Sequence, residues 1–573
     1  MRCKLLFATS ALFVVLATGF ADSALAADVG GKALPAQQPP PVWSWTGGYL
    51  GFHIGAAFGE AKFSDPFGPS IFGDRVRTPA FLGGGQIGYN WQAPGTPWVF
   101  GVEADISGMD SDGSNTCFAF SGFFLSANCR VRPELTGTIT GRIGYAGGPQ
   151  GQTLYYVKGG AAWLDEKVDM ATNALIPPFE TSATVTKWGG TVGAGVEQAL
   201  NPAWSIKLEY DYTTFGGNSL ATPTGFFQVT PPQNLFLLTA GTTSVTHDIH
   251  EVKIGLNYRI GADPWARWPL ASPAYPVKAM PAAAAAGWEF DLGGRYWYSW
   301  GRFQKDLGAT ASAATANVVN SRLTYDTKAN SGEFFGRIET PWNLFVKGFV
   351  GGGRLSSGHM NDEDWAIFDN TGTLVIPYSN SVSDPVKGTI GYATVDVGYD
   401  FFRAPGQKLG AFVGYNYFKE NKDAFGCVQI ANSFSDCVTP VPSSVLVVSE
   451  NDTWNSLRVG VNGEIMVGDR LKLSGDAAYI PYLKFTGLDV HPLRTDVANQ
   501  TSTETGNGGR GVQLEGVLSY YLTPAFSLGV GGRYWAMWTN QNASTNIFGL
   551  QNQTLPSKTE RAGVFFQGSY KFD

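Results

Sequence analysis

The chain has 573 residues, 40 basic and 47 acidic side chains, and a formal net charge of −7. This mildly negative net charge argues against a protein that binds nucleic acid through a basic surface. Aromatic residues make up 14% of the chain, glycine occurs 73 times, and only 15% of residues are charged. This mixture is unusual for a soluble enzyme and suits β-strands whose alternate side chains face lipid.

The first 26 residues have the composition of a signal peptide. Arg2 and Lys4 precede an apolar run, and the segment 24–26, Ala-Leu-Ala, fits a small-residue cleavage pattern. An N-terminal membrane anchor is the alternative, although the run is slightly short for one. Residues 27–45 are rich in proline and glutamine, which predicts a disordered lead-in. No later stretch reaches 18 consecutive apolar residues, so the sequence indicates no transmembrane helix.

Apolar and polar side chains alternate along the segments 49–58, 206–212 and 252–260. A period of two with the charges on one face is typical of outer-membrane strands, which have lipid outside and a polar lumen inside. We predict an eight-stranded barrel over residues 46–261. Its interior should be filled by side chains, so an open pore is not expected. The long loops are expected near 59–79, 109–133, 164–183 and 213–246.

A proline- and alanine-rich segment, 262–287, comes next and predicts a semi-rigid linker. Alternation resumes at Trp288, and we predict a ten-stranded barrel over residues 288–573. A single 18-stranded pore is the alternative; a terminal-like strand in mid-chain, followed by the proline linker, argues against it. The expected fold class is all-β, with two transmembrane antiparallel up-and-down barrels.

The five cysteines indicate two local disulfides. Cys3 leaves with the predicted signal peptide. Cys117 and Cys129 are twelve residues apart, Cys427 and Cys437 are ten apart, and each pair lies between strand-like segments. In an exported chain this spacing predicts two loop disulfides. A metal site is the weaker alternative, because neither pair has a nearby histidine or a Cys-x-x-Cys spacing.

Two short motifs carry candidate chemistry in the second barrel. The segment 358–365, GHMNDEDW, falls at the outer end of the third predicted strand, where Asp362 and Asp364 project to one side if the chain is extended. The segment LDVH places Asp489 and His491 two residues apart at the outer end of the seventh strand. Strands three and seven lie nearly opposite in a ten-stranded ring, so the two pairs are expected to face each other across the mouth.

Such an arrangement suits hydrolysis by an activated water. We expect Asp489 to orient His491, which would take a proton from the water as general base. Asp362 and Asp364, which would share a proton in part, would position that water and stabilise the changing charge at a carbonyl. The predicted target is an amide bond cut without a covalent intermediate. No cofactor and no metal is expected.

Two family resemblances accompany these motifs. WTGGYLGFHIGAAFG, LTGTITGRIGYA, GGTVGAGVEQAL and VKIGLNYRIG in the first half resemble the opacity-protein class of outer-membrane surface-antigen barrels. GHMNDEDW, LDVH and YYLTPAFSLGVGGRYWAMWTN in the second half resemble the omptin family of ten-stranded outer-membrane endopeptidases. The second resemblance implies cleavage of polypeptide substrates at the cell surface, with Asp362, Asp364, Asp489 and His491 as catalytic residues. Both imply a bacterial outer-membrane location with lipid as a partner.

The chain departs from the omptin pattern at two places. The family has an acidic residue two positions before the first member of the Asp-x-His pair, where it helps to bind a basic substrate side chain, and this chain has Gly487. Preference for basic residues is therefore open. Omptins also bind lipopolysaccharide through outward polar groups; Tyr415 and Lys419 fit that role in part, but Tyr417 replaces an acid. No lipopolysaccharide site is assigned.

Other readings of the sequence stay open. Taken alone, the acidic cluster is more typical of a solvated loop or a loose divalent-ion site, and His491 of a surface histidine. The catalytic interpretation depends on finding both motifs on the third and seventh strands together. A non-enzymatic surface antigen, adhesin or envelope stabiliser is the second hypothesis, and a small-solute porin is the third.

Overall fold

All regular structure among the described residues is β-strand. No helix in that part of the chain is long and apolar enough to cross a membrane. The computed structural model describes residues 43–119, 126–148, 150–172, 179–224, 226–230, 234–238, 240–264, 287–308, 319–368, 374–431, 437, 439–467, 469–494, 502–540, 544–547, 550–553 and 556–572.

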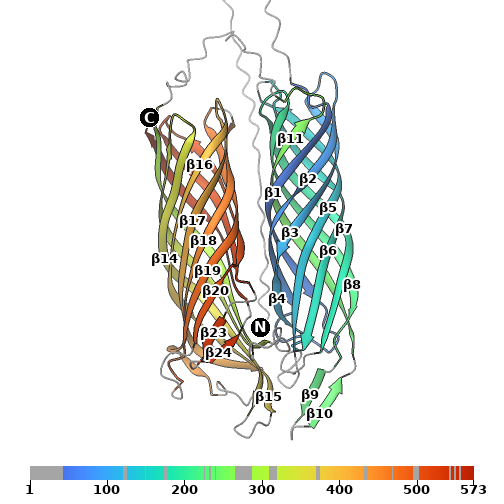
Figure 1. The fold of residues 1–573 in the computed structure, drawn as a ribbon, viewed down its shortest axis with the longest axis vertical. Coiled ribbons are helices and arrows are strands. Elements are labelled where there is room, and N and C mark those ends of the chain that lie inside the picture. The colour runs from blue at the N-terminus through green and yellow to red at the C-terminus, as the bar shows by residue number, and fades with distance from the viewer. Residues whose placement is uncertain are drawn as a thin grey trace, which may run out of the picture. The chain divides into compact units, whose positions relative to one another are not determined.

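Eight long strands close into the first barrel (Figure 1). They pair in the order β1, β2, β3, β5, β6, β7, β8, β11, and the pairing of β11 with β1 completes the ring. β4 extends the edge of β5, and β9 with β10 forms a separate hairpin. The bounds are β1 (Gly47–Phe63), β2 (Arg75–Gln92), β3 (Trp98–Ser111), β4 (Gly113–Cys117), β5 (Ala127–Gly147), β6 (Thr153–Thr172), β7 (Glu180–Ala199), β8 (Trp204–Ala221), β9 (Phe226–Thr230), β10 (Asn234–Leu238) and β11 (Thr242–Arg259).

Ten long strands close into the second barrel, in the order β12, β13, β14, β16, β17, β18, β19, β21, β22, β25, with β25 pairing back to β12. Short strands extend its wall at the end far from the C-terminus (Figure 1). The bounds are β12 (Glu289–Gly308), β13 (Val319–Glu339), β14 (Leu344–Phe368), β15 (Leu374–Ser383), β16 (Val386–Ala404), β17 (Gln407–Ala431), β18 (Val441–Val467), β19 (Leu471–Val490), β20 (Ser502–Asn507), β21 (Arg510–Tyr521), β22 (Phe526–Trp538), β23 (Ser544–Ile547), β24 (Leu550–Gln553) and β25 (Ser557–Phe572).

The predicted fold class, an all-β chain with one ring of eight strands and one of ten, is confirmed. The extent predicted for the external loops is wrong, because the strands continue well into them. β6, for example, runs to Thr172 and β8 runs to Ala221, within the loops expected near 164–183 and 213–246. GHMNDEDW lies on β14, which continues to Phe368 and pairs with β15. Strand pairing persists there although the apolar–polar alternation that marks a lipid-facing wall has ended. The predicted leader, 1–26, and most of the linker, 262–287, lie outside the described residues.

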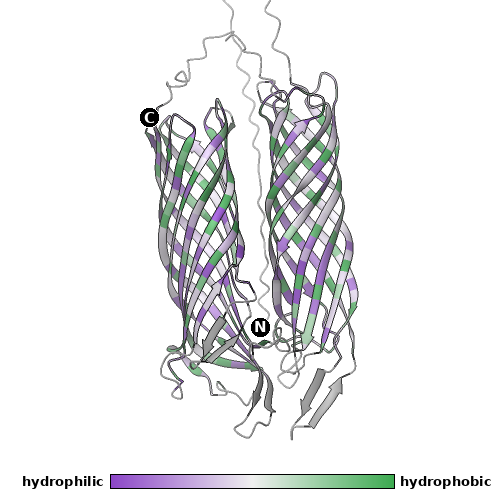
Figure 2. Ribbon diagram, viewed as in Figure 1, coloured by the Kyte–Doolittle hydropathy of each residue, from purple (hydrophilic) through white to green (hydrophobic). Residues whose placement is uncertain are grey.

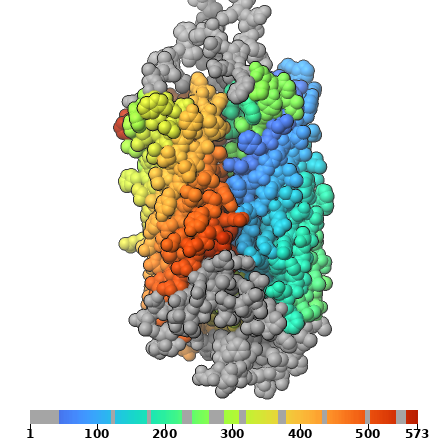
Figure 3. Space-filling view, in the orientation of Figure 1, coloured from blue at the N-terminus to red at the C-terminus, as the bar shows by residue number. Residues whose placement is uncertain are grey.

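Large apolar side chains are exposed along the strands of both barrels. Hydrophobic and hydrophilic residues alternate along these strands (Figure 2). On β14 the exposed large apolar side chains end at Val350, and on β18 they end at Leu457. Farther along β14, Arg354, Ser356 and His359 are exposed instead. In the space-filling view the second barrel, coloured yellow to red, has an unbroken wall over the middle of the face shown (Figure 3). The strands therefore extend beyond the lipid-facing band on the side of the long loops.

Buried ion pairs fill the lumen of the first barrel. Arg142 lies 3.2 Å from Glu197, and Lys158 lies 2.7 Å from Glu209. Each of these four side chains is almost completely buried. A buried charge is tolerated when it is paired, so this network satisfies the polar lumen without leaving an aqueous passage.

The lumen of the second barrel is crossed by an aromatic layer. The rings of Trp297, Tyr392 and Phe418 pack within 5.2–5.6 Å of the Trp535 ring, measured between centroids. The guanidinium of Arg533 lies in the same layer, 2.7 Å from a carboxylate oxygen of Glu333 and 2.6 Å from one of Glu515. On the side of the short turns the lumen opens into a charged cavity of about 110 Å³. The layer therefore separates that cavity from the outer part of the lumen.

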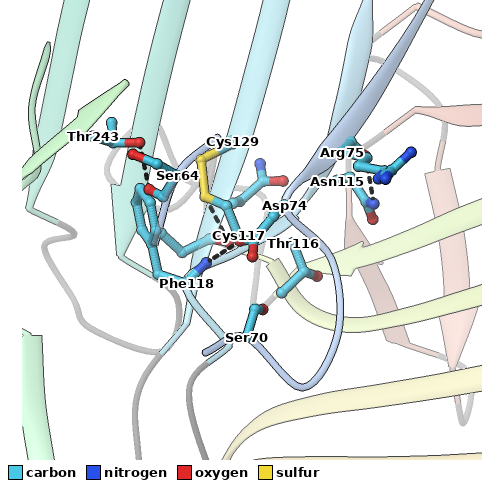
Figure 4. Close-up of a disulfide and its surroundings, with 12 residues drawn as sticks. Ser64, Ser70, Asp74, Arg75, Asn115, Thr116, Cys117, Phe118, Cys129 and Thr243 are labelled. Carbon is cyan, nitrogen blue, oxygen red and sulfur yellow. Dashed lines mark hydrogen bonds between the residues drawn. A yellow bond between two sulfur atoms is a disulfide. The ribbon is translucent and has the colours of Figure 1, made fainter. Parts of the chain in front are cut away.

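Two disulfides brace the outer strand ends, as the cysteine spacing predicts. Cys117 at the end of β4 is bonded to Cys129 on β5, and Cys427 on β17 is bonded to Cys437. Around the first bond, Asp74 accepts a hydrogen bond from the backbone N–H of Phe118 at 2.9 Å (Figure 4). The first disulfide lies inside a buried apolar cluster that includes Phe63, Phe118 and Val131.

Candidate active site

The outer lumen of the second barrel, beyond the lipid-facing band, holds a concentration of charged side chains. Asp489 near the end of β19 pairs in register with Glu450 on β18, and Gly487 pairs with Glu504 on β20. His491 directly follows β19. The other members of the cluster come from three strands: Lys305 from β12, Tyr325 from β13, and Asp362 and Asp364 from β14.

Asp489 and His491 are in direct contact. The Nε2 atom of His491 lies 3.1 Å from Oδ1 and 3.3 Å from Oδ2 of Asp489. The Asp489 side chain is buried, while the His491 side chain is 20% exposed. When Nε2–H donates to Asp489, the imidazole lone pair is on Nδ1, which is then the atom that can accept a proton.

Lys305 lies between three carboxylates. Its Nζ atom is 2.7 Å from Asp489, 2.9 Å from Glu450 and 2.8 Å from Glu504. Burial alone would lower the pKa of the Lys305 ammonium, but the three carboxylates outweigh burial and hold that pKa well above its usual value. Burial likewise opposes ionisation of Asp489, yet Lys305 and His491 hold the pKa of Asp489 well below its usual value. The Lys305–Asp489 pair is therefore fully charged.

Asp362 and Asp364 alternate with buried residues on β14 and are half-buried themselves. They stand opposite Leu323 and Ser321 of β13. Burial, together with the charges of Asp364 and Asp489, raises the pKa of Asp362 well above its usual range. The charge of Asp489 thus acts on Asp362 across the lumen, although the two residues are on strands four places apart in the ring. A proton shared by two neighbouring carboxyls is the state that such crowding favours.

Three buried aromatic rings underlie the cluster. The rings of Trp454 and Phe485 lie 4.5 Å apart, and Phe303 lies 6.3 Å from Phe485. Trp454 donates from Nε1 to Asp452 at 2.8 Å. Asp452 forms a buried ion pair with Lys422, whose Nζ atom lies 4.1 Å from the centre of the Phe303 ring, so the layer beneath the cluster is both aromatic and charged.

One group of carboxylates in the described part of the chain has the spacing of a metal site. Oxygen atoms of Glu450, Asp489 and Glu504 lie within 4.8 Å of one another. The ammonium group of Lys305 already contacts all three. Their charge is thus met by a lysine, and a divalent ion does not fit between them without displacing it.

The structure brings the four residues expected from sequence into one end of one barrel, with Asp489 and His491 in contact. Four members of the cluster were missed: Lys305, Tyr325, Glu450 and Glu504. Lys305 lies in a strand whose outer end carries no distinctive motif, and Glu504 is thirteen residues beyond His491 in the sequence. Only the pairing of β20 with β19 brings Glu504 to the site.

Comparison with known proteins agrees with the two-barrel architecture. The model of the outer membrane protein beta-barrel domain matches residues 23–259, and that of the omptin family matches residues 316–570. The 31 kDa outer-membrane immunogenic protein of Brucella melitensis is 34% identical over 260 residues, which are 44% of this chain and 99% of that protein. The 22 kDa outer membrane protein of Rhizobium leguminosarum bv. viciae is 33% identical over 196 residues, 34% of this chain and 75% of that protein.

Among solved structures, the outer membrane protease OmpT from Escherichia coli matches with 14% sequence identity and a TM-score of 0.42, over 50% of this chain and 97% of that chain. From the matched model and the relatives, the chain belongs to the β-barrel proteins of the bacterial outer membrane, and its second half matches the omptin family model.

Proposed function

We propose that the second barrel is a surface endopeptidase that hydrolyses peptide bonds with an activated water. The observation that carries the proposal is the contact between His491 Nε2 and Asp489 at the outer end of the lumen, where the His491 side chain is 20% exposed. The omptin-family match over 316–570 supports the same class of substrate. Lipopolysaccharide stays a candidate lipid partner of this barrel, without an assigned site.

The proposed chemistry has three parts. Asp489 accepts a hydrogen bond from Nε2–H of His491, and Nδ1 takes a proton as water attacks the peptide carbonyl carbon. Asp362 and Asp364 bind that water, and their shared proton hydrogen-bonds the oxygen on which charge develops. The proton held by His491 then passes to the departing amine. No covalent intermediate is formed.

Cleavage of a fluorogenic peptide library by cells that express the protein tests this proposal. We expect His491→Ala and Asp362→Asn to lower cleavage at least 100-fold, because each removes a group that acts on the water. His359→Ala is the matched control, since His359 is an exposed histidine on the outward face of β14. Heat-dependent gel mobility checks that each barrel assembles. Equal cleavage by the parent and His491→Ala, or no cleavage by the parent, would overturn the proposal.

A second candidate function, as a surface antigen, concerns the first barrel. It is favoured by the relative named as an outer-membrane immunogenic protein, which this chain covers over 99% of its length. The lumen packed with ion pairs adds to it, because such a barrel presents its external ends rather than a channel. Binding of antibodies against the β8–β11 connection to intact cells is the expected result, and binding only to broken cells would remove this candidate.

A further inference from the structure

Among the described residues of the outer cluster, only Lys305 brings a permanent positive charge into contact with Asp489. An ammonium group has three N–H donors, and three carboxylates lie within 2.9 Å of this one. The side chain is buried, so water does not screen these contacts. Lys305 is therefore held in a single place by the charges around it.

Lys305 and His491 act on the same atom. Nζ of Lys305 lies 2.7 Å from Oδ2 of Asp489, and Nε2 of His491 lies 3.3 Å from that oxygen. A cation bound to a carboxylate weakens the attraction of that carboxylate for a second cation. Lys305 thus opposes the gain of a proton by His491, which a base must avoid before the reaction begins.

The surrounding charge shows why such a cation is needed. Besides Lys305, the titratable groups around this space are Tyr325, Asp362, Asp364, Glu450, Asp489 and Glu504, with the buried Lys422–Asp452 pair behind them. Most of these groups are carboxyls, and those that are ionised favour a protonated imidazole. Arg494 follows in the same turn as His491, but its side chain is exposed and screened by solvent.

We propose that Lys305 is a positioning residue, which fixes the Asp489 carboxylate and keeps His491 in its neutral, proton-accepting form at neutral pH. The proposal rests on the proposed function, since it assigns the pH range of that same site. It predicts that charge at position 305, and not merely its volume, governs the protonation of His491.

The experiment compares Lys305→Met, which keeps the length of the side chain, with Lys305→Arg, which keeps its charge. Labelling of His491 by diethyl pyrocarbonate is measured by peptide mass spectrometry between pH 5 and 9, because the reagent modifies the neutral imidazole. We expect Lys305→Met to raise the pH of half-maximal labelling by about one to two units, and Lys305→Arg to move it by less than half a unit. The low-pH limb of kcat/KM for peptide cleavage should move by the same amounts.

An unchanged midpoint in Lys305→Met, or equal shifts in both variants, would overturn the proposal. Glu450→Gln gives a second test if Lys305→Met does not assemble. It removes a negative charge that contacts Lys305 and should move the labelling midpoint downward; no movement would count against the proposal. Labelling needs no activity, so a protein that cleaves no peptide refutes the proposed function while the role of Lys305 is still decided by the midpoints.

Discussion

Glu504 on β20 lies directly opposite Gly487 on β19, and a methyl carbon added at Gly487 would stand 2.6 Å from Oε2 of Glu504. Position 487 is the place at which the omptin resemblance implies an acidic side chain. In this chain the space is filled by a carboxylate that comes from the neighbouring strand. The carboxyl group of Glu504 therefore lies where an acidic side chain at position 487 would lie.

Gly487→Asp should consequently destabilise the barrel. The new side chain would collide with Glu504 and add a negative charge beside Asp489, at a cost of about 1–3 kcal/mol. The measurement is the temperature at which the heat-dependent gel shift occurs. Gly487→Ala is the steric control and should give a smaller decrease. Adding Glu504→Ser to Gly487→Asp should restore most of the lost stability. A double variant as unstable as Gly487→Asp would contradict the view that Glu504 occupies the space of a side chain at position 487.

Glu504→Gln should change how stability depends on pH. Burial and the neighbouring Glu450 raise the pKa of Glu504 to about 8, from an ordinary value of 4.5, although Lys305 opposes them. Between these two values the folded protein holds a proton that the unfolded chain releases. The free energy of unfolding therefore falls as pH rises through this window, by at most about 1.4 kcal/mol per pH unit.

Because glutamine does not ionise, Glu504→Gln should match the parent near pH 4.5 and unfold at a higher temperature than the parent above pH 8. The check is a pair of melting curves in detergent across that range. Glu60→Gln, at a partly exposed acid on β1, is the control for a general effect of charge removal. A constant difference between Glu504→Gln and the parent at all pH values would contradict this account.

Planar bilayers containing the parent protein should give no conductance steps from the second barrel, because the aromatic layer fills its lumen. Trp535→Ala removes a buried ring from the centre of that layer and should lower stability by about 3–5 kcal/mol while allowing small ionic steps. Trp342→Ala is the control, since Trp342 is 67% exposed on the outer surface. Steady conductance by the parent would restore the porin hypothesis.

Alkylation should detect no free thiol among Cys117, Cys129, Cys427 and Cys437 before reduction, and four after it. Cys427→Ser with Cys437→Ser should speed proteolytic cutting at the tip of the β17–β18 hairpin, because the lost crosslink restrains about ten residues and contributes about 2.5–3 kcal/mol locally. The melting temperature of the barrel should change little. A large decrease would mean that this bond supports the whole wall.

Sequence reasoning predicts the walls better than the mouth. Alternation along 252–260 predicts strand β11 because lipid on one side and charge on the other impose opposite chemistry on successive residues. Beyond the lipid that constraint ends, so the continuation of β14 to Phe368 leaves no such pattern in the sequence. The number of strands and the two disulfides can be predicted from the sequence. The distance to which the strands extend beyond the lipid cannot.

The candidate site divides in the same way. Asp489 and His491 are two residues apart, so their contact follows from local geometry and was predicted. Lys305 and Glu504 are distant in sequence from that pair, and their approach depends on the pairing of β20 and on the closure of the ring. A lysine that contacts three carboxylates leaves no motif in the sequence, because each of its partners comes from a different strand.

The length of β14 has a consequence for what can reach the mouth of the second barrel. Asp362 lies twelve positions past Val350, the outermost large apolar side chain exposed on that strand. At about 3.3 Å per residue and a tilt near 45°, this distance lifts the carboxylate ~25–30 Å above the bilayer core. A neighbour embedded in the same leaflet would need an extended stem of ~8–10 residues to climb that far. Membrane proteins whose extracellular parts are shorter than this cannot reach Asp362. Only proteins with long extracellular segments, or chains free in solution, can reach the mouth of the barrel.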